Sequence, residues 1–177
     1  GDEIEARLVV SSADPRVTFV KLCEPGTLPA DFLADVNHFK YRGSSGKVNL
    51  ALSGLPEFTC LKHDKALALR AARGAFSISP SIEYLERAYD DAKYGHWSNK
   101  PYIDMIIPTL VDPSMAPPGK HVISCFVQYA PYKLAPELGS WDDQREAFGD
   151  AVIDRIAEFA PGIRDSILFR NVQTPLD

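Results

Sequence analysis

The sequence predicts an α+β fold, in which a mixed, mainly antiparallel sheet has helices packed on one face. The patterns along the chain read as strand, two helices, two strands, helix, two strands, helix and strand, without the regular strand–helix alternation of a parallel fold. The chain has 177 residues, of which 45% are hydrophobic and 24% are charged, as in a globular protein with its own core. We expect residues 1–177 to form a single domain.

The first forty residues predict a strand and two short helices. Residues 4–11 form an apolar run that favours a strand. Asp14 followed by Pro15 is a typical helix start, because aspartate caps free N–H groups and proline suits the first helical position. This helix should be brief, ending at Pro25-Gly26. A second helix is expected over residues 29–40, where apolar residues recur at helical spacing.

The next segment predicts two strands separated by an irregular stretch. Residues 47–53 alternate between apolar and other residues, which predicts a strand with one buried face. Residues 54–74 show no clear period, and we expect them outside the core, as a surface helical turn or a mobile excursion. Residues 74–79 favour a short strand.

A helix and a strand follow. The helix is expected to begin at Ser79-Pro80-Ser81 and to end at Gly95. Residues 102–110 predict a strand that contains Pro108. Because proline cannot donate a hydrogen bond to a neighbouring strand, this end of the strand should lie at a sheet edge or a bulge.

The most specific stretch of the chain is residues 112–132. Asp112-Pro113 and Pro117-Pro118-Gly119 predict a tight turn, because proline presets φ and glycine accepts a positive φ. Residues 121–130 are rich in β-branched and aromatic residues and stop at Pro131, so they predict a buried strand. We expect this strand in the middle of the sheet.

The C-terminal part predicts a helix and a last strand. Ser140 and Asp143 have the spacing of a capping box, and apolar residues then recur at helical period until Pro161-Gly162. Residues 166–173 favour the final strand.

Composition excludes several classes of function. The net charge of −5 disfavours a nucleic-acid partner, and no apolar run approaches the roughly 20 residues that span a membrane. The three cysteines are too few and too irregularly spaced for a disulfide framework. The four histidines do not cluster with each other or with cysteines, so no metal site is expected.

The sequence carries no common catalytic motif. It lacks the glycine-rich dinucleotide and phosphate loops, the HExxH zinc motif and the GxSxG nucleophile motif. Cys125 lies within an expected buried strand, where it is interpreted as a small apolar residue. Aromatic residues gather near the end of that strand, and they form either core or the wall of a cleft for a large apolar ligand. The residues predicted for such a wall are Phe126, Gln128, Tyr129 and Tyr132.

Several motifs resemble the phytoene-desaturase-like FAD-dependent oxidoreductases, and the nearest branch is the pyridine nucleotide-disulphide oxidoreductase domain-containing protein 2 type. They cover nearly the whole chain in order, and the Asp-Pro-Ser-Met-Ala-Pro-Pro-Gly-Lys-His run is the most specific of them. The motifs stand at residues 11–15, 47–52, 81–92, 112–122 and 141–153.

The resemblance implies the middle, substrate-binding domain of such an enzyme, folded over a flavin held by the two ends of a longer chain. Hydride would pass between flavin and an apolar substrate of the isoprenoid or carotenoid kind. Both flavin-binding motifs of the family are missing here, so we expect a fragment that does not retain FAD and is inactive alone. Ser12, Ala13 and Asp14 are predicted to bind the cofactor. The resemblance identifies no catalytic residue in this chain.

The partners implied are therefore an apolar small molecule and the remaining FAD-binding domain of the same protein. The expected location is intracellular, in the cytoplasm, or in the mitochondrion of a eukaryote. Two other readings stay open. One is a non-enzymatic module that binds an apolar ligand or a protein. The other is a scaffold whose edge strand near Pro108 pairs with a partner.

Overall fold

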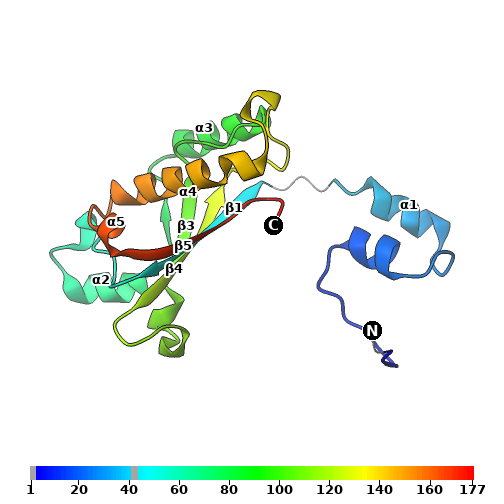
Figure 1. Ribbon diagram of the computed structural model, residues 1–177, viewed down its shortest axis with the longest axis horizontal. Coiled ribbons are helices and arrows are strands. Elements are labelled where there is room, and N and C mark those ends of the chain that lie inside the picture. The colour runs from blue at the N-terminus through cyan, green and yellow to red at the C-terminus, as the bar shows by residue number, and fades with distance from the viewer. Residues whose placement is uncertain (1–2, 41–43) are drawn as a thin grey trace. The chain divides into compact units, whose positions relative to one another are not determined.

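The computed structural model describes residues 3–40 and 44–177, which fall into two units on either side of residues 41–43 (Figure 1). The first unit contains no strand among its described residues, so the strand predicted over residues 4–11 is wrong. Ile4 and Val10 are 86% and 88% exposed. An apolar run becomes a strand only where a neighbouring strand pairs with it, and none of the strands in the described residues pairs with this run.

The predicted helix start at Asp14 is confirmed. Its Oδ1 atom accepts hydrogen bonds from the backbone N–H groups of Arg16, at 2.8 Å, and Val17, at 3.0 Å. The turn continues as a π-helical segment, η1 (Val17–Leu22), and the second predicted helix is α1 (Ala30–His38). The rings of Phe19 and Phe32 join the two segments edge to face, with centroids 5.0 Å apart.

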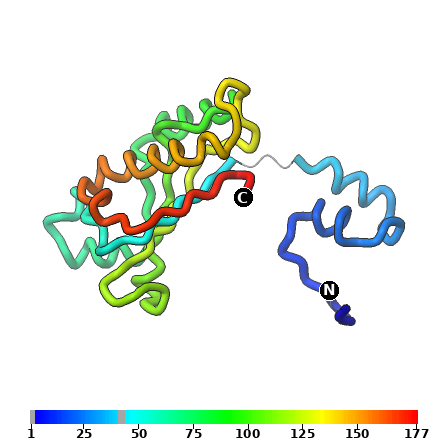
Figure 2. The backbone as a smooth tube through the Cα atoms, viewed as in Figure 1, coloured from blue at the N-terminus to red at the C-terminus, as the bar shows by residue number. Residues whose placement is uncertain are grey.

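The second unit is built on a five-stranded sheet in the order β2-β3-β4-β1-β5, with every neighbouring pair antiparallel. The predicted α+β class is confirmed, and β4 lies between β3 and β1 as expected for a central strand. Figure 2 shows the C-terminal strand in red beside the cyan β1. The strands are β1 (Ser45–Leu52), β2 (Phe76–Ile78), β3 (Tyr102–Ile106), β4 (His121–Gln128) and β5 (Ile167–Gln173).

The strand predicted over residues 102–110 is shorter than expected, and the prediction about its edge is wrong. β3 ends at Ile106, and Pro108–Leu110 form a 3-10 turn, η3. β3 itself is paired on both sides, with β2 and β4. Proline therefore ends the ladder instead of marking a sheet edge, because it has no N–H group to continue the pairing. β3 is therefore not the edge strand that the scaffold alternative requires near Pro108.

The turn between β3 and β4 forms as predicted. Asp112 accepts a hydrogen bond from the backbone N–H of Ser114, at 3.0 Å, and starts the short 3-10 helix η4 (Pro113–Met115). Gly119 has a φ of +75°, the conformation that the sequence required of it.

Helices α3 (Ile82–Lys93) and α4 (Trp141–Ala157) lie on the same side of the sheet (Figure 1). The smaller helical elements are η2 (Thr59–Leu61), α2 (Lys65–Ala72), η5 (Pro136–Leu138) and α5 (Ile163–Ser166). None of the described helices is long and apolar enough to cross a membrane.

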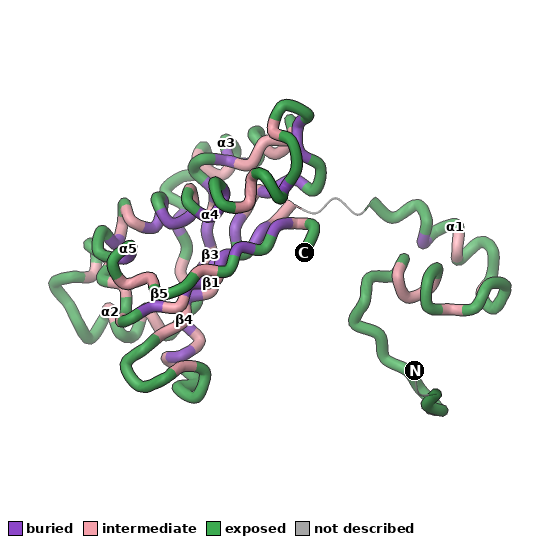
Figure 3. The backbone as a smooth tube through the Cα atoms, in the orientation of Figure 1, coloured by how far each residue is buried: buried purple, intermediate pink, exposed green. Residues whose placement is uncertain are grey.

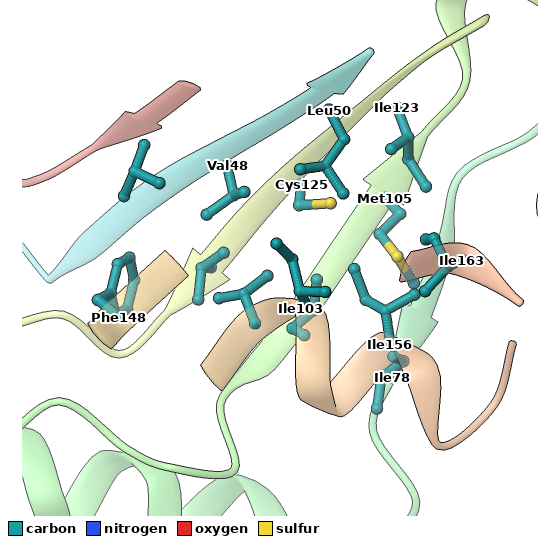
Figure 4. Packing of buried hydrophobic residues seen from close by; sticks show 14 of the residues in the cluster. Val48, Leu50, Ile78, Ile103, Met105, Ile123, Cys125, Phe148, Ile156 and Ile163 are labelled. Atoms are coloured by element: carbon teal, nitrogen blue, oxygen red, sulfur yellow. The ribbon is translucent and has the colours of Figure 1, made fainter. Parts of the chain in front are cut away.

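The core lies between α4 and the sheet (Figure 4). Figure 3 shows the buried positions, in purple, along α4 and the strands. Phe148 and Ile156 of α4 are fully buried, as are Val48 and Leu50 of β1 and Cys125 of β4. A Cβ atom on Gly149 of α4 would stand 2.6 Å from Cγ2 of Val172, so the absence of a side chain there lets α4 approach β5.

The capping box predicted at the start of α4 is confirmed. Ser140 and Asp143 each bind the backbone N–H group of the other. The hydrogen bonds from the Ser140 hydroxyl and backbone N–H lower the pKa of Asp143. The carboxylate form is therefore the one that stabilises the helix start.

We expect the stability that this cap contributes to be lost in acid. Because the pKa of Asp143 is lowered by folding, its contribution is complete above the unfolded pKa of about 3.9 and is lost as pH falls through the lower folded value. Urea unfolding at pH 6 and pH 3 should therefore show a smaller pH dependence for Asp143→Asn than for the wild type. Asp142→Asn is the matched control, because it removes the same charge from the same turn without touching the cap. An equal change in both variants would contradict this expectation.

Candidate functional site

One side of the sheet packs against α4, and the other side faces away from it. We call the side that faces away from α4 the open face. It is formed by the alternate residues of each strand, and none of these residues is buried. Antiparallel sheets commonly present one such face to their surroundings. Its members are Lys47, Asn49, Ala51, Ser77, Tyr102, Asp104, Ile106, Val122, Ser124, Phe126, Gln128, Phe169, Asn171 and Gln173.

Phe126 stands near the middle of the open face among polar groups. Register places it between Asp104 of β3 and Lys47 of β1, and its side chain is 45% exposed. The Asp104 carboxylate accepts a hydrogen bond of 2.6 Å from the Ser77 hydroxyl, which orients it at the β2 side. An exposed ring with hydrogen-bonding groups on both sides suits an apolar ligand that carries a few polar atoms.

The adjoining row of the open face is polar and ordered. The Ser124 hydroxyl donates a hydrogen bond of 2.8 Å to the side-chain oxygen of Asn49, on the neighbouring strand. Asn171 of β5 continues this row beyond Asn49. These groups can bind and orient a ligand, and the face offers no activated nucleophile for covalent chemistry.

The four residues predicted to form one aromatic wall divide between two regions. Phe126 and Gln128 lie on the open face, two positions apart on β4. Tyr129 instead contacts Tyr89 of α3, with ring centroids 5.1 Å apart. Tyr132 is 52% exposed and follows Pro131, whose carbonyl accepts a hydrogen bond from Trp141 at the start of α4. The chain changes direction after β4, which the sequence pattern did not reveal.

Ser12, Ala13 and Asp14, predicted to approach the cofactor, lie in the exposed turn before η1 in the first unit. Their polar groups are partly used within that turn. The backbone N–H of Ala13 donates to Ser11 Oγ at 3.3 Å, and Asp14 caps the following helical turn. Their contact with a cofactor stays a prediction.

A second feature, which sequence reasoning missed, is a cavity of about 780 Å³ that we call the α2 pocket. It lies between α2, the segment before it, strand β2 and the residue Phe159 that follows α4. Its walls are mainly apolar, with Lys62, Lys65, Glu57 and Cys60 also contributing. The large apolar side chains of the lining are Leu55, Phe58, Leu61, Leu69, Phe76, Ile78, Met105 and Phe159.

Specific contacts join the segments that form the α2 pocket. The backbone N–H of Thr59 donates to the carbonyl of Phe159 at 2.8 Å, which fixes the pocket segment to the end of α4. The rings of Phe58 and Phe76 meet edge to face, 5.1 Å apart, and Asp64 caps α2 by accepting from Leu67 N–H. As predicted, residues 54–74 lie outside the buried core. The signal that could have revealed the pocket was the supply of leucine and phenylalanine in a stretch without a periodic pattern.

Cys125 behaves as the small buried apolar residue that the sequence predicted. It is fully buried, and burial raises the pKa of its thiol to about 12, so it stays protonated and unreactive near neutral pH. Across residues 3–40 and 44–177, no group of three or more His, Cys, Asp or Glu side chains is placed to hold a metal ion.

Comparison with known proteins shows what the chain is similar to. The motifs predicted a resemblance to the phytoene-desaturase-like oxidoreductases, and the comparisons confirm this resemblance. In particular, the chain is 34% identical over its whole length to pyridine nucleotide-disulfide oxidoreductase domain-containing protein 2 of Mus musculus, and 35% identical to the protein of the same name in Rattus norvegicus. A more distant match is prolycopene isomerase 2, chloroplastic, of an Oncidium hybrid cultivar, 26% identical over 99% of the chain.

The chain corresponds to 31% of the length of each of the two rodent relatives and to 27% of the isomerase. No protein-family model matches it. The relatives' names point to an oxidoreductase family, and the activity, cofactor and substrate of this chain are matters for proposal.

Proposed function

We propose that this chain is the substrate-binding domain of an FAD-dependent oxidoreductase, with the open face turned toward an apolar substrate. The relationship to the oxidoreductase-named relatives over the whole chain supports the enzyme class. The observation that carries the assignment of the open face is the exposed ring of Phe126 at the centre of an uncovered sheet, between Asp104 and Lys47.

The described residues do not provide a cradle for FAD. A dinucleotide is normally held by a glycine-rich loop leading from a strand into a helix, and none of the described helices follows a strand through such a loop. The remaining FAD-binding domain of the whole protein would supply that site. We propose that Ser12, Ala13 and Asp14 contact the FAD. They would do so through polar groups that are not already hydrogen-bonded within their own turn.

In this proposal the flavin supplies the hydride chemistry, and the substrate is an isoprenoid or carotenoid-like molecule. The chain's own residues bind and place that molecule. Phe126 offers a flat apolar contact, while Ile106 and Phe169, 46% and 69% exposed, extend the apolar area of the open face. Covering these side chains with an apolar substrate removes water from the face, and the polar row of Ser124 and Asn49 limits how the substrate can lie.

An absorption spectrum of the whole protein after reconstitution with FAD tests the enzyme class. Flavin bands are expected for the whole protein and not for residues 1–177 alone. Their absence from the whole protein would instead favour a non-enzymatic module that binds an apolar ligand or a protein.

The open face is tested in the same preparation by adding a carotenoid and recording the change in the flavin spectrum. Phe126→Ala should weaken this change, whereas Ile82→Ala should not, because Ile82 is a 78% exposed apolar residue of α3, away from the open face. Flavin bands combined with an unchanged carotenoid response in Phe126→Ala would keep the enzyme class and reject the open face as the substrate surface.

A further inference from the structure

The α2 pocket has the size and lining of a small-molecule site, separate from the open face. Its volume of about 780 Å³ falls within the roughly 300–1,000 Å³ of such sites. The lining is built from Leu55, Leu61 and Leu69 together with three phenylalanines, so its interior suits a hydrocarbon chain. Leu55 and Leu69 remain 37% and 45% exposed, which is apolar area that a ligand would remove from water.

The charges around the pocket favour an anionic head group. Lys62 and Lys65 both line it, and neither forms an ion pair with a carboxylate in the described parts of the chain. Glu57 is the single carboxylate in the lining, so the two ammonium groups leave a net charge of one positive unit (2 − 1). This balance matches a monoanion better than a phosphate or diphosphate, which carries more negative charge.

We propose that the α2 pocket binds a long-chain fatty acid, with its hydrocarbon chain against the leucine and phenylalanine side chains and its carboxylate at Lys62 and Lys65. The lysine stems also cover apolar surface, while their ammonium groups remain at the water boundary where the head group would lie. This site goes beyond the proposed function, since it needs neither flavin nor the open face.

Cys60 provides a direct reporter, because it is an exposed free thiol in the pocket lining. The experiment uses the whole protein that carries this chain, stripped of lipid, with oleate as the probe. Alkylation of Cys60 by iodoacetamide is followed by peptide mass spectrometry. Saturating oleate should slow it roughly tenfold, because a bound chain covers most of the pocket wall. Alkylation of Cys23, in the first unit, serves as the internal control and should not change.

Three comparisons make the test specific. Combined Lys62→Met and Lys65→Met should raise the oleate concentration needed for half-protection about fivefold, because two exposed charge contacts are lost while the apolar stems remain. Lys133→Met, at an exposed lysine outside the pocket, should not. Ala68→Phe should fill the pocket and abolish protection, whereas Ala66→Phe, on the same helix but outside the lining, should preserve it.

Several results would overturn the proposal. These are an absence of protection by oleate, equal protection by uncharged oleyl alcohol, or protection unchanged in the two-lysine variant. Protection by phosphatidylserine-containing vesicles without protection by free oleate would also overturn it, because the pocket would then be meeting a membrane surface. None of these readouts depends on flavin, so failure here leaves the FAD spectrum and the carotenoid response unaffected.

Discussion

Phe148→Ala should lower the free energy of unfolding by about 3–5 kcal/mol, because it deletes a fully buried ring and leaves a cavity. The ring lies edge to face with Trp97 and Trp141, with centroids 5.9 and 5.4 Å away. It also fills the space above Gly46, where a Cβ atom would stand 2.6 Å from the ring. The ring thus fastens the first half of α4 to β1, and its neighbours cannot collapse into the space without moving strand backbone.

The matched control for this change is Phe126→Ala, which removes the same atoms from the opposite face of the sheet. Because the Phe126 ring is 45% exposed, its loss should cost less than about 1 kcal/mol. Chemical unfolding of both variants, by circular dichroism in urea, gives the comparison. Similar losses for the two variants would mean that the open face is covered in the folded protein, contrary to the architecture described above.

Cys125→Asp should destabilise the protein by about 4 kcal/mol or more at pH 7. A carboxyl group at this buried position must be protonated or lie uncompensated among apolar neighbours, and protonating it about three pH units above its ordinary pKa costs about 1.4 kcal/mol per unit. Met105 and Val48, on the two neighbouring strands, face the same position and are buried. Burial already raises the pKa of the native thiol to about 12.

The loss of stability in Cys125→Asp should depend on pH. The introduced carboxyl has a pKa raised by folding, so the deficit should be largest above the folded pKa and should shrink as pH falls toward 4. Ser124→Asp is the control, since the adjacent residue of β4 points to the open face. It should cost about 1 kcal/mol, mainly for the lost hydrogen bond to Asn49. Equal losses in the two variants would contradict the assigned orientation of β4.

Local chemistry predicted much of the second unit. The prolines and Gly119 defined the turn before β4, and Ser140 with Asp143 defined the start of α4. These features depend on φ preferences and on hydrogen bonds within a few residues, so they can be read from neighbours in sequence. The strand predicted over residues 4–11 was wrong for the complementary reason, because a strand needs a distant partner and none of the described strands pairs with this run.

The candidate sites were less predictable. Phe126 and Gln128 were identified and do share the open face, while Tyr129 lies against Tyr89 of α3. Pro108 was expected to mark a sheet edge or a bulge. It instead follows the end of β3, a strand inside the sheet. The supply of leucine and phenylalanine in residues 54–74 could not place the α2 pocket, because its walls come from segments that approach one another only after β2 pairs with β3 and residue 59 bonds to residue 159.

The sequence by itself determined the α+β class, the central position of β4, the caps and turns, and the resemblance to an oxidoreductase family. The tertiary structure alone decided which face of the sheet α4 covers, that the other face stays open around Phe126, and that α2 encloses a pocket. The division has a physical reason. Propensities and caps act over a few residues, whereas a face or a pocket exists only where strand register and helix docking bring distant residues together.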